Sequence, residues 1–289
     1  MKLFATDLDG TLLNEKHSVS PENKQAILRA KEQGIHIVVA TGRSYHAAKK
    51  PLDEAGLSCP VICLNGAKVH NDAGDILATS PLDIKSCRNI QQTCQDNDMY
   101  FEIFTNQGGF SESRDQFIDV MVDIMKTSFP DANIEDVRKR ATDRFQEEEI
   151  TIIEDFEELF AREDLEVYKI LAFSLDEQTL NNVYEQLNGN DTIAVTSSGA
   201  SNLEFNHPNA QKGIALEKYA KQLGIEMKDV MTIGDNFNDL SMLTMAGRGV
   251  AMGNAEPEII EACDYTTKTN KENGVAHAID EMLQELNER

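Results

Sequence analysis

The sequence contains no tryptophan, few aromatic residues (6%) and a shortage of positive charge. Its 27 Lys and Arg residues stand against 50 Asp and Glu residues, so the formal net charge is −23 at pH 7. A field of this sign repels polyanions, and we therefore expect no nucleic-acid partner. It also disfavours a small anionic substrate unless a cation or local basic groups offset it at the binding site.

Long hydrophobic runs are also missing from the sequence. The apolar stretch at the N-terminus is broken by Asp7 and Asp9, well short of the length of a signal peptide or a membrane-spanning helix. We therefore expect no export segment, no membrane partner and a cytoplasmic location.

Paired cysteine motifs are absent as well. The five cysteines are odd in number and scattered, with no CxxC pair among them: Cys59, Cys63, Cys87, Cys94 and Cys263. This distribution favours buried thiols in a reducing compartment over a zinc site or a disulfide framework.

The chain has 289 residues, about twice the usual size of a domain, so two domains or one large one are expected. Its beginning alternates between strand and helix, the pattern of a doubly wound α/β core. Ser20 and Pro21 are typical of a helix start and Gly34 of a helix end. A turn signal at 71–75 predicts a hairpin after the third strand. The expected strands lie at 2–8, 35–40 and 61–64, and the expected helices at 20–33 and 44–55.

The character of the sequence changes near residue 83, where longer polar helices begin and an acidic stretch follows at 143–166. Strand and helix alternate again after Lys212. An insertion explains this order better than two sequential domains. We therefore predict a doubly wound parallel-sheet core from 1–82 and 209–289, interrupted by an α+β domain at 83–208. In the insertion we expect helices at 83–98, 113–128 and 176–188 and strands at 100–105, 168–174, 192–197 and 202–206. In the second part of the core we expect helices at 213–223, 239–246 and from 274 onward, and strands at 229–233 and 249–252.

The first candidate site is the run Asp7-Leu8-Asp9-Gly10-Thr11, at the end of the first predicted strand. Residues two apart on a strand share a face, so both carboxylates can point into one crevice. One carboxylate can attack phosphorus while the other acts as general acid and base, and Gly10 lets the backbone approach a phosphate. An Asx-turn or a helix cap explains the same residues. A calcium-binding EF-hand loop fails because Leu12 and Ser18 stand where Gly and Glu are needed.

Three further segments follow predicted strands or open predicted helices. Thr41-Gly42-Arg43 can hold phosphate oxygens at a helix N-terminus, although a simple cap explains it too. Asn65-Gly66 is either a binding turn or a tight structural turn. Lys212-Gly213 opens a helix, where a lysine can neutralise phosphate or remain solvated.

The segment 234–239 (GDNFND) places two carboxylates and two amides after an apolar strand. Asn238 and Asp239 lie three and four residues beyond Asp235, so a helix starting there would bring them to one face. Clustered oxygen donors favour Mg²⁺, although a capped helix start remains an alternative. Ligands bind at the carboxyl edge of open α/β sheets, and all the candidate groups fall at that edge.

The four motifs together resemble the haloacid dehalogenase-like (HAD) superfamily of phosphatases, in its Cof-like branch. They are DLDGTLL at 7–13, TGR at 41–43, KG at 212–213 and GDNFND at 234–239, with a cap domain between the second and third. The resemblance spans essentially the whole chain, and no catalytic position departs from the family pattern. It implies a Rossmann-like core, a substrate-selecting cap and a phosphoric monoester hydrolase.

The resemblance also implies residue roles. Asp7 would be the nucleophile, Asp9 the general acid and base, and Thr41 and Lys212 the ligands of the transferring phosphoryl group. Magnesium would be held by the Asp7 carboxylate, the Asp9 backbone carbonyl and Asp235, with Asn238 or Asp239 in support. Phosphate or substrate contacts are expected from Gly10, Gly42, Arg43, Asn65, Gly66 and Asn238.

Motifs of several other enzyme classes are missing from the sequence. The chain lacks HExxH, GxSxG and GxxxxGK[ST], which argues against a zinc protease, a serine hydrolase and a P-loop kinase. A phosphosugar mutase with the same aspartyl-phosphate stays open, as does a phosphometabolite-binding regulator without turnover.

The substrate is expected to be a small phosphorylated metabolite. A sugar phosphate comes first, with flavin mononucleotide or pyridoxal phosphate behind it. Aromatic and methionine residues at 99–125 could line a pocket, but the helical spacing of Phe117, Met121 and Met125 favours core packing. The sequence does not determine the oligomeric state, and a monomer is compatible with it.

Overall fold

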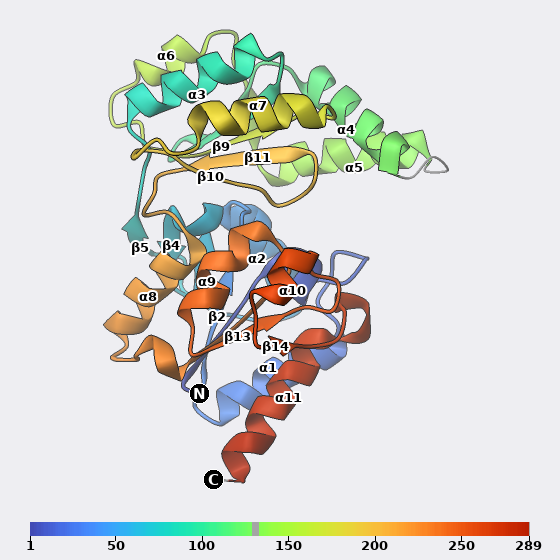
Figure 1. Ribbon diagram of the computed structural model, residues 1–289, viewed down its shortest axis with the longest axis vertical. Coiled ribbons are helices and arrows are strands. Elements are labelled where there is room, and N and C mark those ends of the chain that lie inside the picture. Colours follow the sequence, from blue (N-terminus) through green and yellow to red (C-terminus); the bar gives the residue numbers. More distant parts are fainter. Residues whose placement is uncertain (129–132, 289) are drawn as a thin grey trace. The chain divides into compact units, whose positions relative to one another are not determined.

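The computed structural model describes residues 1–128 and 133–288 (Figure 1). The chain divides into two compact units. The core unit combines Met1–Thr79 with Asn209–Arg289, and the inserted unit is Ser80–Pro208.

The core unit is built on an eight-stranded sheet in the order β14-β13-β12-β1-β2-β3-β4-β5. Strands β14 to β3 run parallel, and β4 and β5 add an antiparallel hairpin at one edge. The strands are β1 (Leu3–Thr6), β2 (His36–Ala40), β3 (Val61–Cys63), β4 (Lys68–His70), β5 (Ile76–Thr79), β12 (Val230–Gly234), β13 (Arg248–Ala251) and β14 (Tyr265–Thr266). The helices are α1 (Pro21–Glu32), α2 (Tyr45–Glu54), α8 (Lys212–Gln222), α9 (Leu240–Met245), α10 (Pro257–Glu261) and α11 (Gly274–Asn287).

Apolar side chains from alternate strand positions attach helices to this sheet. Leu3 and Ala5 of β1 share a buried cluster with Leu216 of α8 and Met242 of α9. Helices α1 and α11 pack against each other, and α1 also contacts β2. Helix α1 begins where the sequence predicts, because the Ser20 hydroxyl accepts the backbone N–H of Asn23.

The order in which strands are added to the sheet reverses at β1. From β1 the chain moves to β2 and β3 on one side, and after the insertion β12, β13 and β14 fill the other side. The carboxyl ends of β1 and β12 are therefore neighbours at a topological switch point, which is where ligands bind in open α/β sheets. The predicted doubly wound core is confirmed.

The inserted unit is an α+β structure on a six-stranded sheet in the order β10-β11-β9-β6-β7-β8. All of its pairings are antiparallel except β7 with β8. The strands are β6 (Tyr100–Thr105), β7 (Gly108–Ser111), β8 (Ile150–Ile152), β9 (Val167–Phe173), β10 (Ala194–Thr196) and β11 (Asn202–Asn206), and the helices are α3 (Ile84–Asp96), α4 (Arg114–Ser128), α5 (Ile134–Glu147), α6 (Phe156–Phe160) and α7 (Glu177–Leu187).

Strand β6 divides its side chains between two packing faces. Phe101 and Ile103 join the cluster that includes residues of α3, α6 and α7. Tyr100 faces the other way and packs with Phe117 of α4 and Phe145 of α5. This alternation is the normal consequence of the two-residue strand period.

Several elements of the fold were not predicted. Helix α5 is among them, although its buried residues Val137, Ala141 and Phe145 are spaced four apart. Strand β7 begins with two glycines, which hid its strand character. The other unpredicted elements are β8, α6, α10 and β14.

The aromatic residues of the insertion are core residues, as the helical spacing indicated. Five aromatic residues between 99 and 125 and one methionine are buried, namely Tyr100, Phe101, Phe104, Phe110, Phe117 and Met99. Met121 is partly buried, and the side chain of Met125 lies outside the described residues.

The five cysteines form no disulfide in the described chain. Four are buried as predicted, whereas Cys263 is partly exposed. None of the helices in the described ranges combines the length and the apolar character that crossing a membrane requires.

Candidate active site

Asp7 stands directly after β1, in the centre of the core sheet. Its backbone is extended (φ −66°, ψ 167°), and its N–H donates to the carbonyl of Ile233 on β12 at 3.0 Å. The parallel register of β1 and β12 therefore brings Asp7 level with the start of the 234–239 loop. Only 5% of the Asp7 surface is exposed.

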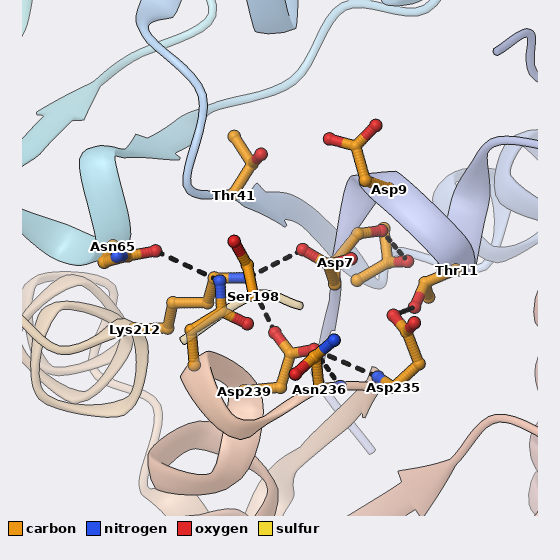
Figure 2. A network of polar contacts seen from close by, with 12 residues as sticks. Asp7, Asp9, Thr11, Thr41, Asn65, Ser198, Lys212, Asp235, Asn236 and Asp239 are labelled. Atoms are coloured by element: carbon orange, nitrogen blue, oxygen red, sulfur yellow. Dashed lines mark hydrogen bonds and ion pairs between the residues drawn. The ribbon is translucent and has the colours of Figure 1, made fainter. Parts of the chain in front are cut away.

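Lys212 links two carboxylates from opposite ends of the sequence. Its Nζ donates to Asp7 Oδ1 and to Asp239 Oδ1, each at 2.6 Å (Figure 2). Neither Lys212 nor Asp239 has any exposed surface. Burial alone would lower the pKa of the Lys212 ammonium, but the Asp239 and Asp7 carboxylates outweigh it and raise that pKa. The lysine is therefore a buried, ion-paired group, contrary to the alternative of a solvated side chain.

Asp239 closes the loop that carries Asp235. Its Oδ2 accepts the backbone N–H of Asp235 at 3.0 Å and that of Asn236 at 3.1 Å. Gly234 makes room for this arrangement, because a Cβ there would lie 2.6 Å from the Asp239 carboxyl carbon. The segment after Asn236 is a 3₁₀ turn (Phe237–Asp239) that leads into α9, so the helix predicted at 239–246 is present and begins at Leu240. Both Asp239 oxygens are thus engaged by the chain.

Gly10 and Thr11 bring the Asp7 loop against Asp235. The Thr11 hydroxyl donates to Asp235 Oδ1 at 2.7 Å. Gly10 has φ +74°, and a Cβ at this position would lie 2.3 Å from Asp235 Oδ2. Only glycine allows both the backbone conformation and this approach. Thr11 was missed as a site residue by the sequence analysis, although it lies within the DLDGTLL motif.

The three carboxylates form one compact cluster. One oxygen from each of Asp7, Asp235 and Asp239 lies within 4.8 Å of the others. Burial, and then the Asp239 charge, raises the pKa of Asp7 well above its usual range, while Lys212 opposes the shift. The same two causes raise the pKa of Asp235 to about 7. A cation placed among these oxygens would stabilise their ionised forms.

Asp9 lies in a different environment from Asp7. Its side chain is 48% exposed. Arg43 donates two hydrogen bonds to it, from Nε to Oδ2 at 2.7 Å and from Nη2 to Oδ1 at 2.5 Å. Arg43 also donates from Nη1 to the carbonyl of Ala47 in α2. Arg43, which was predicted to contact the substrate, therefore forms an ion pair with Asp9, the predicted general acid.

The remaining predicted residues surround the same edge of the sheet. Thr41 is buried after β2, and its hydroxyl accepts the Arg43 N–H across Gly42. Asn65 is buried with left-handed backbone (φ 60°), and its Oδ1 accepts from Asn238 Nδ2 at 3.3 Å. Gly66 packs so closely that a Cβ would lie 2.6 Å from the Gln211 carbonyl, next to Lys212.

Comparison with known proteins gives the family of the chain. The family model of haloacid dehalogenase-like hydrolases matches residues 4–279. The chain is 36% identical to phosphatase YwpJ of Bacillus subtilis, over 98% of this chain and 100% of that protein. It is also 36% identical to the 5-amino-6-(5-phospho-D-ribitylamino)uracil phosphatase YwtE of the same organism, covering 98% of each. A solved haloacid dehalogenase-like hydrolase from B. subtilis superposes with a TM-score of 0.88 at 35% identity, over 97% of this chain and 99% of that one.

The α/β core, the carboxylate cluster and these relatives define a phosphoric monoester hydrolase. The chain belongs to the haloacid dehalogenase-like hydrolases, in the Cof-like branch that its four motifs predicted.

Proposed function

We propose that the protein is a magnesium-dependent phosphatase that hydrolyses small phosphorylated metabolites through an aspartyl-phosphate on Asp7. The observation that carries the proposal is the ion-paired chain Asp7–Lys212–Asp239 beside Asp235. This arrangement offers a carboxylate nucleophile in Asp7 and a fixed positive charge in Lys212. The remaining carboxylate oxygens could bind a metal cation as a second positive charge.

Asp7 forms the bond to phosphorus, and the bond from phosphorus to the leaving oxygen breaks. Lys212 holds the Asp7 carboxylate by one oxygen, so its other oxygen can face the phosphoryl group. The lysine charge offsets the negative charge of nucleophile and phosphate as they approach. Thr41 completes the proposed phosphoryl site, with backbone contributions from Gly10, Gly42 and Gly66.

Asp9 supplies the proton to the leaving oxygen and then takes one from the water that hydrolyses the aspartyl-phosphate. Its exposure suits a group that must reach a leaving oxygen beyond the phosphate. Both Asp9 oxygens accept hydrogen bonds from Arg43, so Arg43 must release one of them before Asp9 can carry the proton that it donates. Substrate contacts from Arg43, Asn65 and Asn238 belong to the same proposal.

The residues present fit a magnesium ion. Asp7 and Asp235 are hard oxygen donors, and Mg²⁺ needs only one or two carboxylates together with water and substrate oxygens. The Asp9 carbonyl is the third proposed ligand, with Asn238 or Asp239 in support. Because both Asp239 oxygens bind the chain, we assign Asp239 chiefly to holding Lys212 and the Asp235 loop. When bound, the ion neutralises phosphate charge and aligns the phosphoryl group for in-line attack.

We infer the substrate class from the substrates for which the relatives are named. A sugar phosphate remains our first candidate. The relative YwtE is named for a phosphorylated ribityl chain joined to a pyrimidine, a sugar-alcohol phosphate with a flat ring. Flavin mononucleotide shares both features. We propose the inserted domain, 83–208, as the cap that selects among such leaving groups.

Steady-state assays with Asp7→Asn test the nucleophile. With Mg²⁺ and a panel of phosphorylated sugars and cofactors, the wild type should release inorganic phosphate and the variant none. The surface change Asp53→Asn is the matched control and should behave as wild type. Equal rates for Asp7→Asn and the wild type would refute the assignment, and an isomerised sugar phosphate without free phosphate would indicate a mutase.

Chelation tests the metal. EDTA should stop phosphate release, and added Mg²⁺ should restore it. Activity that survives metal removal would exclude magnesium dependence.

A further inference from the structure

We propose that Asn254 is a positioning residue that holds the two acidic loops, 7–13 and 234–239, at the separation at which they can share one divalent cation. The inference deepens the proposed function and depends on it. Asn254 lies outside the four motifs and in the turn after β13.

Asn254 fixes the first acidic loop through its side chain. Its Nδ2 donates to the backbone carbonyl of Gly10 at 2.9 Å. Gly10 is the residue with positive φ that abuts the Asp235 carboxylate, and the adjoining Thr11 donates its hydroxyl to Asp235. Holding the Gly10 carbonyl therefore sets the peptide plane that leads into the Thr11–Asp235 hydrogen bond.

The backbone of the same turn holds the second acidic loop. The N–H of Glu256 donates to the carbonyl of Asp235 at 3.1 Å, and the N–H of Met252 donates to the carbonyl of Gly234 at 2.9 Å. One short turn, 252–256, is thus bonded to both loops. We call this turn the bridging turn.

The bridging turn is itself anchored from behind. Asn254 Oδ1 accepts the backbone N–H of Asn270 at 2.8 Å, and Asn270 Nδ2 donates to the carbonyl of Leu13 at 3.0 Å. Gly253 lies so close to the chain after β14 that a Cβ would be 2.9 Å from the Thr267 carbonyl. Asn254 is therefore held in one orientation by an anchor that also reaches the end of the first acidic loop.

The reason such a clamp is needed is electrostatic. Lys212 pairs with Asp7 and Asp239, and Asp235 lies in the same cluster, so the ionised carboxylates of the two loops repel each other when no cation is present. A link that opposes this repulsion prepares the ligands in advance and strengthens metal binding. Loss of an outer hydrogen-bonding partner typically weakens metal affinity about 10- to 100-fold.

Calorimetric titration of the purified full chain with Mg²⁺ tests the proposal. We expect Asn254→Ala to raise the Kd for Mg²⁺ about tenfold, and Asn270→Ala to raise it less. The kcat of Asn254→Ala at saturating Mg²⁺ should stay within a few-fold of wild type. Asn71→Ala is the matched control, because Asn71 bridges the Asp75 turn of the β4–β5 hairpin in the same way and should leave the Kd unchanged.

The outcomes separate this inference from the proposed function. A wild type that binds no Mg²⁺ would refute the metal itself. A wild type that binds Mg²⁺, beside an Asn254→Ala variant with the same Kd, would overturn the role of Asn254 and leave the phosphatase proposal intact. A lower kcat at saturating Mg²⁺ with an unchanged Kd would likewise overturn it.

Discussion

Each unit of the protein contains a buried ion-pair network, and the two differ in their charge balance. In the inserted unit, Arg144 meets Glu102 through two hydrogen bonds of 2.6 and 2.7 Å. Tyr100 donates to the same carboxylate and receives a hydrogen bond from Ser111. The charge of Arg144 thus balances the charge of the buried Glu102 carboxylate.

The core network is not neutral. Lys212 faces two carboxylates, and Asp235 adds a third within the same cluster. Burying excess charge of one sign is unfavourable unless something compensates for it. The comparison teaches that a balanced buried network can be explained by packing alone, whereas an unbalanced one at a sheet edge indicates a site that binds a cation.

The largest effect should come from removing the positive charge of Lys212 from the core network. We expect Lys212→Met to lower kcat about 1,000-fold, because a fixed charge at the reacting group is lost. Phosphate release at saturating Mg²⁺ measures this, with circular dichroism to establish that the fold is kept. A kcat within tenfold of wild type would mean that Lys212 is structural, like Arg144.

Breaking the Arg144–Glu102 pair should lower the stability of the protein. Arg144→Met leaves the fully buried Glu102 without its cation, which should lower the free energy of unfolding by about 3 kcal/mol. Urea unfolding measures the change. The Kd for Mg²⁺ should not move, and a variant as stable as wild type would contradict the assigned role of this pair.

The affinity for Mg²⁺ should fall as the pH falls, because Asp235 becomes protonated. Burial raises the pKa of this carboxyl to about 7, so below that pH a proton must leave before a cation binds. We expect the Kd for Mg²⁺ to rise about tenfold per pH unit below 7, the slope for one released proton. Titrations between pH 6 and pH 8, in buffers of different ionisation enthalpy, would count the protons. Equal affinity at pH 6 and pH 8 would contradict a raised pKa of Asp235.

The smallest effect should come from an exposed ion pair. Arg88 pairs with Glu157 on the surface of the inserted unit, and both side chains are about half exposed. Water and salt screen such a pair. Arg88→Gln should therefore leave the urea midpoint unchanged, and a clear decrease would weaken the distinction between buried and exposed networks.

The prediction from sequence was most successful where local signals agreed. The alternation of aliphatic runs with capped helices, such as Ser20-Pro21 before α1, predicted the parallel core. It failed for elements whose local signals conflict with their structure. Helix α5 has a mostly polar sequence, and β7 has two glycines, so tertiary packing decides both.

The candidate site shows the same division. The motifs placed Asp7, Asp9, Lys212 and Asp235 at one sheet edge, because strand ends of a parallel sheet converge there. They did not indicate that Arg43 grips Asp9, or that a turn at 252–256 bonds both acidic loops. Those contacts join residues far apart in sequence.

By itself the sequence determined the family, the doubly wound core with its insertion, and which residue types gather for phosphate chemistry, since each is encoded in short local patterns. Only the tertiary structure decided how the charges are shared. Whether Lys212 is solvated or buried between two carboxylates depends on the packing of α8 against the loops after β1 and β12, and no local pattern encodes that distance.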